Sequence, residues 1–357
     1  MVSRTTTGHR PRGFESVSII LDKQDEIPSP EFVEHLKSIN KDIEIIPAHI
    51  WTPWFGMFGE NGGFNSMQEC FQDQAKHVHA IETGMSSDPA MNWRIPELDS
   101  KAILSFSDSH SYWPWRMGRE CSIFDMARPS YKELIRQIRE REHVGTIETS
   151  PNYGKYHFTG HRNCKIVMSP DEAKKLNNIC PVCKSKLTVG VMARVDELAD
   201  PKRPEGFKPE NAKPYYTLVP LSELISGFNG WPVASKKTWA IFNKLMETFK
   251  TEFEILLDAP EKKIASLTSA EFAQLVLKNR AGTVRVLPGF DGVYGVPLIK
   301  GTETYAFDKA GDYAETEGAP AGRKKPARKE SAHAPSSQRA AIPLPAKDQR
   351  GLTDFFG

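Results

Sequence analysis

The chain has 357 residues, of which 39% are hydrophobic and 10% aromatic, which is enough for a buried core and for two or three packed domains. Its five cysteines include a Cys-Pro-Val-Cys motif, which favours a reducing, cytoplasmic compartment and a metal site over a disulfide framework. The net charge of +2 conceals a basic cluster at residues 323–329. The sequence has neither an apolar run of about eighteen residues nor a signal-peptide pattern, so secretion and membrane insertion are not expected.

Short β-like runs alternate with helical stretches from residue 15 to about residue 144. This alternation is typical of βα units around a parallel sheet or barrel, and we expect residues 1–144 to form one such domain. The predicted strands are SVSIILD, DIEIIPAHI, HVHAIE and KAILSFS, and the predicted helices are SPEFVEHLKSI, SMQECFQDQAKH and SYKELIRQIRER.

The rest of the chain divides into three kinds of segment. Residues 145–205 are rich in Gly, His and Cys and predict a small metal-binding module, whereas residues 206–300 contain the amphipathic stretches SKKTWAIFNKLMETFKTEFEILL and SAEFAQLVLKNRAG and predict a mostly helical domain. A hairpin is expected around Gly289 and Asp291-Gly292 at its end. Residues 301–346 have the composition of a disordered linker.

Three predicted strands end in side chains that bind metals. Asp108 and His110 follow the strand KAILSFS, His49 ends DIEIIPAHI, and Glu82 ends HVHAIE. In a parallel βα barrel such strand ends gather on one face, so these four residues are candidate catalytic ligands for Zn²⁺, Mn²⁺ or Mg²⁺, with hydrolysis as the chemistry. The alternative is that they are ordinary polar residues where strands meet solvent.

Aromatic and basic residues follow the same strand ends. Aromatic rings at such positions could stack on an unstacked base, and Arg116 and Arg119 could meet phosphates, although packing over the barrel mouth explains the rings equally well. The candidate aromatic residues are Trp51, Trp54, Phe55, Phe58, Trp113 and Trp115.

A second metal site is predicted from ligand spacing. His161 and Cys164 form one pair, and Cys180 and Cys183 form another, which together give the pattern H-x₂-C-x₁₅-C-x₂-C. This spacing is typical of a structural Zn²⁺ site whose metal contributes folding energy. His157 is a competing candidate for the position of His161.

The last residues, QRGLTDFFG, predict a docking peptide. Gln349, Leu352, Phe355 and Phe356 fit a Q-x-x-h-x-x-a-a pattern, in which Leu and the aromatic pair meet on one face of a short turn. This pattern resembles the PIP box that binds the sliding clamp PCNA, and it points to an archaeal source. We therefore assign residues 347–357 as a clamp-binding segment that raises the effective concentration of the protein on DNA.

Five long motifs resemble the endonuclease Q family of PHP-domain nucleases over roughly residues 15–300. They are PAHIWTPWFGMFG, IETGMSSDPAMNWR, SDSHSYWPWRMGRE, GTIETSPNYGKYHFTGHRNC and CPVCKSKLTVGVMARVDELAD. The resemblance implies a DNA repair enzyme that cuts on the 5′ side of a deaminated base (uracil, hypoxanthine or xanthine) or an abasic site. It also implies that His49, Glu82, Asp108 and His110 are PHP metal ligands.

The first PHP motif, Asp-x-His-x-His, does not occur before His49, and GHRPR near the start does not match it. The expected fold is therefore an incomplete, N-terminally truncated PHP-type distorted βα barrel, followed by a zinc-ribbon-like module, a mostly helical C-terminal domain and a disordered tail. Without that motif the metal centre would lack two histidines of the PHP ligand set.

We expect a monomeric, nucleoid-associated, metal-dependent endodeoxyribonuclease whose partners are deaminated DNA and PCNA. One alternative is a PHP-type phosphoesterase that acts on small phosphomonoesters. Another is a catalytically inactive adaptor for DNA or the clamp, including one associated with a helicase. The chain itself is not expected to be a helicase, because it lacks the G-x₄-G-K-[ST] phosphate loop.

Overall fold

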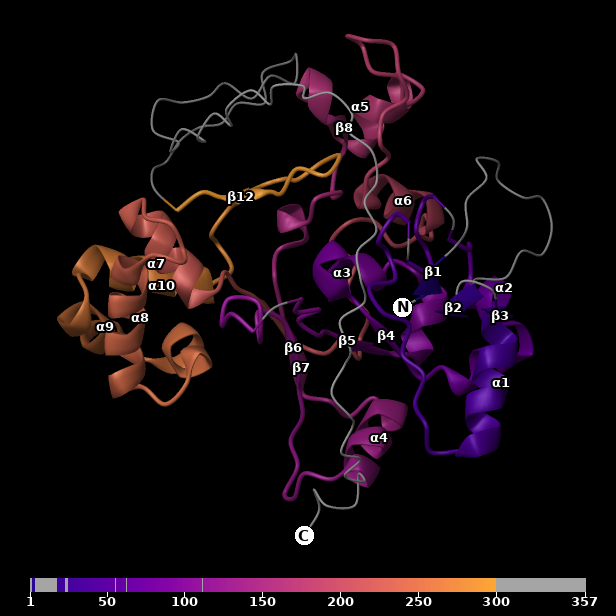
Figure 1. The fold of residues 1–357 in the computed structure, drawn as a ribbon, viewed down its shortest axis with the longest axis horizontal. Helices are drawn as coiled ribbons and strands as arrows, with labels where there is room; N and C mark the ends of the chain where they lie inside the picture. The colour runs from indigo at the N-terminus through magenta and orange to yellow at the C-terminus, as the bar shows by residue number, and fades with distance from the viewer. Residues whose placement is uncertain are drawn as a thin grey trace, which may run out of the picture. The chain divides into compact units, whose positions relative to one another are not determined.

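The computed structural model describes residues 2–3, 18–22, 25–54, 56–61, 63–110 and 112–299 (Figure 1). The strands are β1 Val2–Ser3, β2 Ser18–Asp22, β3 Asp25–Pro28, β4 Ala80–Glu82, β5 Ala102–Leu104, β6 Cys121–Ile123, β7 Gly145–Glu148, β8 Thr159–His161, β9 Ile166–Met168, β10 Tyr215–Thr217, β11 Val286–Leu287 and β12 Val296–Pro297. The α-helices are α1 Ser29–Ile39, α2 Met67–Phe71, α3 Pro89–Asn92, α4 Tyr131–Glu140, α5 Pro170–Lys175, α6 Val191–Leu198, α7 Leu221–Asn229, α8 Lys236–Thr248, α9 Glu261–Leu267 and α10 Ala270–Arg280.

Several short helical turns connect these elements. They are the 3₁₀ turns η1 Gln72–His77, η2 Gly84–Ser86, η3 Pro96–Ser100, η4 Pro151–Tyr153 and η5 Arg162–Cys164, and the π-helical turn η6 Glu254–Asp258.

The described strands form small mixed sheets. β4 pairs in parallel with β5, β7 pairs in parallel with β10 and antiparallel with β6, and the remaining pairs, β1–β2, β2–β3, β8–β9 and β11–β12, are antiparallel. The predicted mixed α/β class and the helical C-terminal region are confirmed. A closed PHP barrel stays a prediction, because each sheet among the described residues has only two or three strands.

One predicted strand is wrong. The run DIEIIPAHI forms no strand, although its end lies against β4 through two backbone hydrogen bonds, from the Ile50 amide to the Glu82 carbonyl (3.3 Å) and from the Glu82 amide to the Pro47 carbonyl (3.1 Å). Pro47 has no N–H to donate, and His49 turns to a φ of 33°, so the ladder cannot continue. His49 therefore sits on a turn beside β4, not at the end of a strand.

Two large apolar cores support these elements. The first joins α1, the turn after His49, β4 and α6 through Val33, Ile50, Phe58, Ile81 and Val195. The second packs β7 against the four C-terminal helices, and its buried members include Ile147, Leu224, Leu245, Ile264 and Val276. Two smaller clusters lie under β5 and α4 and around the Cys-rich segment.

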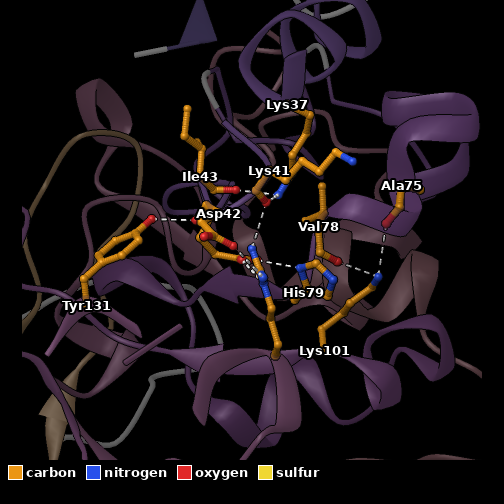
Figure 2. A network of polar contacts seen from close by, with 11 residues as sticks. Lys37, Lys41, Asp42, Ile43, Ala75, Val78, His79, Lys101 and Tyr131 are labelled. Atoms are coloured by element: carbon orange, nitrogen blue, oxygen red, sulfur yellow. Dashed lines mark hydrogen bonds and ion pairs between the residues drawn. The ribbon is translucent and has the colours of Figure 1, made fainter. Parts of the chain in front are cut away.

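A polar network anchors the segment that leads to His49 (Figure 2). The buried Glu44 carboxylate accepts hydrogen bonds from His79 Nδ1 (2.6 Å) and Arg139 Nε (2.8 Å), and the Tyr131 hydroxyl donates to the Asp42 carbonyl (2.7 Å). Burial opposes ionisation, but these two donors hold the pKa of Glu44 below its usual value. The network joins residues 42–44 to the start of β4 and to α4.

Arg194 makes a buried connection between α6 and the turn region at residues 58–65. Its guanidinium donates to the carbonyls of Phe58 and Phe64, at 3.1 Å each, and to Asn65 Oδ1 at 2.7 Å, and it pairs with Glu197 at 2.9 Å. The side chain is 4% exposed, so these partners are needed to offset the loss of water around a buried charge.

Candidate metal centres and nucleic-acid surface

His49 and Glu82 lie side by side at the end of β4. The His49 amide donates to Glu82 Oε2 at 2.6 Å, and His49 Nδ1 is buried without a hydrogen-bond partner among the described residues. A buried nitrogen left unpaired costs about 1–3 kcal/mol, and a metal ion is one partner that would satisfy it. The position of His49 therefore fits a metal ligand.

The backbone around this pair is constrained. Gly84 has a φ of +56°, and a Cβ atom there would lie 2.7 Å from the Cβ of His49, so only glycine fits both the conformation and the space. His49 and Asp108 have positive φ values of 33° and 41°. Strained non-glycine residues of this kind cluster at functional sites, which makes both positions stronger candidates.

Asp108 and His110 follow β5 on an exposed segment. Asp108 Oδ1 lies 3.3 Å from His110 Nε2, and the two side chains are 47% and 77% exposed. The Nε of Arg119 donates to the carbonyl of Ser107 at 3.0 Å and so holds this segment from the other side. Burial raises the pKa of Glu82 and the negative charge of Asp108 adds to the effect, which places the two carboxylates within electrostatic reach of each other.

The predicted catalytic ligands thus form two pairs, His49 with Glu82 and Asp108 with His110. The structure does not bring three of their ligand atoms within 4.8 Å of one another, which is the separation within which the Cys/His set below gathers. Imidazole nitrogens and carboxylate oxygens nevertheless suit a divalent cation. A shared ion on all four residues stays a prediction.

Two buried carboxyl groups lie in the same region and were not predicted. Glu120, just before β6, and Glu148, the last residue of β7, are 1% and 0% exposed. The Ser105 hydroxyl lies between them, 2.9 Å from Glu148 Oε2 and 3.3 Å from Glu120 Oε2. Burial raises the pKa of Glu120 to about 7, and burial followed by the charge of Glu120 raises the pKa of Glu148 well above its usual value.

A repeated tripeptide could have revealed Glu148. Ile81-Glu82-Thr83 and Ile147-Glu148-Thr149 both end a strand, and their threonines connect the acids to one another. Thr83 Oγ1 donates to Glu148 Oε2 at 2.9 Å, and Thr149 Oγ1 donates to Glu120 Oε1 at 2.7 Å. The ends of β4 and β7 and the residues flanking β5 and β6 therefore share one polar cluster beside Glu82.

The second metal site assembles fully. His161, Cys164, Cys180 and Cys183 place one ligand atom each within 4.8 Å of all the others, and they form the one such group among the described residues. Three thiol sulfurs and an imidazole nitrogen are the ligand set of a structural zinc site. The chain therefore has a cluster that can hold a metal ion at the positions predicted from spacing.

The two ligand pairs have the same local conformation. Cys164 is followed by Lys165 with a φ of 54°, and Cys183 is followed by Lys184 with a φ of 64°. Each pair thus comes from a tight turn that ends in a left-handed residue, as the two-residue spacing within each pair requires. Hydrogen bonds from Ser185 lower the pKa of the Cys183 thiol to about 6, which favours the thiolate that binds metals.

The structure separates the two histidine candidates of this module. His161 Nδ1 lies 3.3 Å from Cys183 Sγ, whereas His157 is 6% exposed, stacks on Phe158 and is not part of the cluster. Burial lowers the pKa of His157 to about 4. His157 is therefore a buried neutral residue.

The C-terminal hairpin is attached to this module. β11 and β12 pair as expected, and the Asp291 carboxylate in their turn accepts hydrogen bonds from the Arg162 amide (2.7 Å) and the Thr188 hydroxyl (2.6 Å). Phe290 also pairs with Phe158 through a β-bridge. The hairpin thus contacts both ends of the metal-binding segment.

Two of the predicted base-stacking tryptophans need correction. Trp51 is 1% exposed and donates from Nε1 to Asn92 Oδ1 at 2.8 Å. It packs on Phe58, another predicted stacking residue, so the rings of Trp51 and Phe58 both belong to the core. Trp115 is 7% exposed and packs on Trp239 of α8 at 5.6 Å between ring centroids. An aromatic ring that follows a strand end can face inward as well as outward, which the sequence does not distinguish.

Two exposed aromatic residues and the buried Trp115 form a short ladder. Tyr112, Trp113 and Trp115 stack in sequence, with ring centroids 5.6 Å and 4.7 Å apart and planes about 20° from parallel. Tyr112 and Trp113 are 80% and 41% exposed, so the outer end of the ladder is open to a base. Trp54 is also partly exposed and meets Tyr156 edge to face.

The two predicted phosphate-binding arginines are half-buried. Burial lowers the pKa of Arg119, and its Nε is already used in holding Ser107. Arg116 lies close enough to Glu223 to help oppose the burial that raises the pKa of that carboxyl, and the Tyr153 hydroxyl donates to the same carboxylate. Phe55 and the clamp residues Gln349, Leu352, Phe355 and Phe356 lie outside the described residues.

One family model and two related proteins match parts of this chain. A family model described as the MJ0043 C-terminal domain matches residues 220–283, which contain α7 to α10. The chain is 30% identical to MJ0043 of Methanocaldococcus jannaschii over 69% of its own length and 31% of that protein, and 28% identical to YqxK of Bacillus subtilis over 70% and 59%. It therefore spans about a third and about three fifths of these two relatives. None of the helices in the described part of the chain combines the length and apolarity that a membrane crossing requires.

Two solved structures indicate the class of protein to which this fold is similar. The chain matches PfuEndoQ, a lesion-specific endonuclease of Pyrococcus furiosus, with a TM-score of 0.68 and 30% identity over 75% of this chain and 65% of that one. It matches endonuclease Q bound to a 27-mer duplex with an abasic lesion at the active site with a TM-score of 0.67 and 30% identity over 76% and 66%. The fold is thus similar to that of a lesion-specific DNA endonuclease. Both of these structural neighbours are endonuclease Q structures, and the resemblance found in the sequence motifs is confirmed.

Proposed function

We propose that the chain is a DNA repair endonuclease of the endonuclease Q type, which hydrolyses the phosphodiester on the 5′ side of a deaminated base or an abasic site. The observation that carries the proposal is the 30% identity, over three quarters of the chain, to an enzyme crystallised with an abasic duplex at its active site. The class of damage among uracil, hypoxanthine, xanthine and abasic sites is part of this proposal.

His49, Glu82, Asp108 and His110 are the proposed ligands of the catalytic centre. The unpaired His49 Nδ1, the adjacent Glu82 carboxylate and the strained backbone of Asp108 support this assignment. Zn²⁺, Mn²⁺ or Mg²⁺ bound there would supply an activated water molecule for hydrolysis. Glu82 would act as a buried anionic ligand, while Asp108 and His110 would approach from the exposed segment.

DNA would be held by residues around this centre. Trp113 and Tyr112 offer stacking faces for an unstacked base, Trp54 offers a third ring, and Arg116 and Arg119 supply positive charge near the same segment. The Cys/His cluster would hold a structural Zn²⁺ and keep residues 158–188 folded. We further propose that residues 347–357 recruit the protein to PCNA.

The direct test is nicking of oligonucleotide duplexes that carry one uracil, hypoxanthine or abasic site, assayed with Mn²⁺, Mg²⁺ and Zn²⁺. The chain should cut 5′ of the lesion, and Asp108→Asn should abolish cutting. Asp125→Asn, which changes an exposed aspartate of the same domain, should retain it. A chain that is folded and metal-loaded but cuts none of these duplexes would contradict the proposal.

A non-catalytic adaptor is the second candidate. The complete Cys/His cluster and the incomplete approach of the other four ligands favour it. Metal analysis of the purified full chain separates the two functions, because an adaptor should hold one tightly bound zinc ion and an enzyme two or more metal ions. A phosphatase screen with small phosphomonoesters tests the remaining alternative.

A further inference from the structure

A cavity of about 670 Å³ lies away from both metal centres. Its volume falls within the range of about 300–1,000 Å³ that is usual for small-molecule sites. Its walls are contributed by α3, η3, the end of α4, the start of β7 and residues 209–214. The charged and polar residues of its wall include Asp99, Lys101, Glu140, Arg141, Glu142, His143, Glu210, Asn211 and Lys213.

The cavity is at the opposite end of the parallel strands from the proposed catalytic centre. Lys101 directly precedes β5, and His143 lies two residues before β7. Glu82 ends β4, which runs parallel to β5, and Glu148 ends β7. Because each strand separates its two ends by about 10 Å, a ligand in the cavity would not occupy the proposed catalytic centre.

Most acidic groups in the cavity wall already have cationic partners. Asp99 accepts two hydrogen bonds of 2.7 Å from Arg203, and Glu140 and Glu142 accept hydrogen bonds of 2.5 Å and 2.6 Å from Arg136. Asp99 thus has an arginine of its own, whereas the single Arg136 guanidinium serves Glu133 as well as Glu140 and Glu142, so these pairs reduce the repulsion of an anion in the cavity without cancelling it.

Two of the cationic groups in the wall are also occupied. The Lys101 ammonium donates to the carbonyls of Val78 (2.6 Å) and Ala75 (3.3 Å), as Figure 2 shows. The Arg141 guanidinium donates to the carbonyl of Asp99. Lys101 thus directs its ammonium at backbone oxygens, whereas Arg141 is exposed and uses one of its five N–H donors on the Asp99 carbonyl.

His143 and Lys213 are the groups without such partners. His143 is 3% exposed, its Nδ1 has no hydrogen-bond partner within the described ranges, and no described residue forms a hydrogen bond or ion pair with the Lys213 ammonium. Burial, followed by the nearby charge of Lys213, lowers the pKa of His143 to about 4, so its ring is neutral at pH 7. Asn211 and the exposed Glu210 complete this wall.

We propose that this cavity binds a small organic phosphate, with the phosphate group between the His143 imidazole and the Lys213 ammonium. A phosphate has several acceptor oxygens, so it can accept hydrogen bonds from both groups at once and satisfy the buried histidine nitrogen. Pro89, Trp93 and Ile103 provide apolar wall for the organic part. The same chemistry is present in the DNA backbone, but lining by several separate elements favours a free phosphomonoester.

The test is calorimetric titration of the full chain without added divalent metal, so that nuclease activity plays no part. The probes are deoxyuridine monophosphate, deoxyuridine, inorganic phosphate and an undamaged duplex. Deoxyuridine monophosphate should bind saturably, and deoxyuridine at least about tenfold more weakly. Lys213→Met and His143→Asn should each weaken mononucleotide binding by roughly tenfold to a hundredfold, because each removes a hydrogen bond to a charged group.

Lys208→Met is the matched control, since Lys208 is exposed on the same segment but does not line the cavity, and it should leave the affinity unchanged. Circular dichroism checks whether His143→Asn is folded, and Lys213→Met tests the site without altering a buried residue. The proposal is overturned if neither the mononucleotide nor phosphate binds at millimolar concentration, or if Lys213→Met leaves mononucleotide binding unchanged. It is also overturned if Lys213→Met weakens only duplex binding, which would assign this lysine to the DNA backbone.

Discussion

The two candidate metal centres differ in how far apart their ligands lie along the chain. The Cys/His cluster takes each pair of ligands from one tight turn, and the two turns come within 4.8 Å of each other inside one short module. The other centre takes His49, Glu82 and Asp108 from three separate segments, and its ligands meet only in pairs.

This difference shows which structural features position the ligands of a metal site in the absence of the metal. In the Cys/His module, local turn geometry sets most of the ligand positions. The apolar cluster around Cys180 is small and contributes little further stability to the module. In the other centre, ligand positions depend on long-range pairing of β4 with the turn at His49 and on the exposed segment after β5. We therefore expect the first site to control folding and the second to control activity.

The largest expected effect is loss of the Cys/His module in Cys180→Ser. Cys180 is fully buried, so the variant loses a ligand and places a hydroxyl in the small core. The zinc content should fall by one ion per chain, with unfolding of the module, as measured by metal analysis and thermal denaturation. Cys70→Ala, a buried cysteine outside the cluster, should retain the ion, and loss of zinc from that control would undermine the assignment.

Glu82→Gln should separate activity from folding. It removes an anionic ligand while keeping an oxygen that can accept from the His49 amide, so stability should change little and nicking should fall by more than about a hundredfold. Glu97→Gln is a matched control, because Glu97 is also a partly buried carboxylate that accepts a backbone N–H, from Met67 at 3.0 Å. Equal losses in the two variants would mean that Glu82 acts through the fold alone.

The buried acids predict that stability falls as the pH rises. Glu120, with its pKa raised to about 7, and Glu148 bind more protons in the folded chain than in the unfolded one, so the free energy of unfolding should decrease from about pH 5 to pH 7. Glu148→Gln should flatten this slope, because it removes one acid and its repulsion of the other. Urea denaturation at several pH values measures the effect, and the exposed Glu247→Gln should keep the original slope.

The smallest expected effect concerns the exposed end of the aromatic ladder. Trp113→Ala removes a stacking face, and loss of one base contact of about 1–3 kcal/mol should weaken binding of lesion DNA roughly tenfold. Stability should change by about 1 kcal/mol, because the ring is 41% exposed and its packing is with Tyr112 and Trp115. Fluorescence anisotropy measures the affinity, and Tyr216→Ala, an equally exposed aromatic residue on β10, should leave it unchanged.

Local sequence patterns predicted the helices well. SPEFVEHLKSI forms α1 over Ser29–Ile39, and the predicted stretches beginning at Ser130 and Ser269 form α4 and α10, with these serines as N-caps. Helix periodicity and capping depend on neighbours within a few residues, so the sequence contains them. The strand at DIEIIPAHI failed because its fate depends on a partner 33 residues away.

The candidate site was predictable in part for the same reason. The two-residue spacing of Cys180 and Cys183 is enough to place both thiols on one tight turn. The burial of Trp51 instead depends on contacts with Asn92 and Phe58, which no local sequence pattern indicates. Glu148 was not predicted, although its tripeptide repeats that of Glu82. The hydrogen bond from Thr83, which follows β4, to Glu148, which ends β7, depends on how the two strands are placed and is not written in either tripeptide.

The attachment of Asp291 to Arg162 and Thr188 has a practical consequence for dissecting the protein. A fragment that stops after α10 would lack the acceptor for both of these donors and leave one side of the Cys/His segment uncovered. Deletion mapping should therefore find that the shortest well-behaved fragment containing this segment extends at least to Pro297, more than a hundred residues beyond its last cysteine.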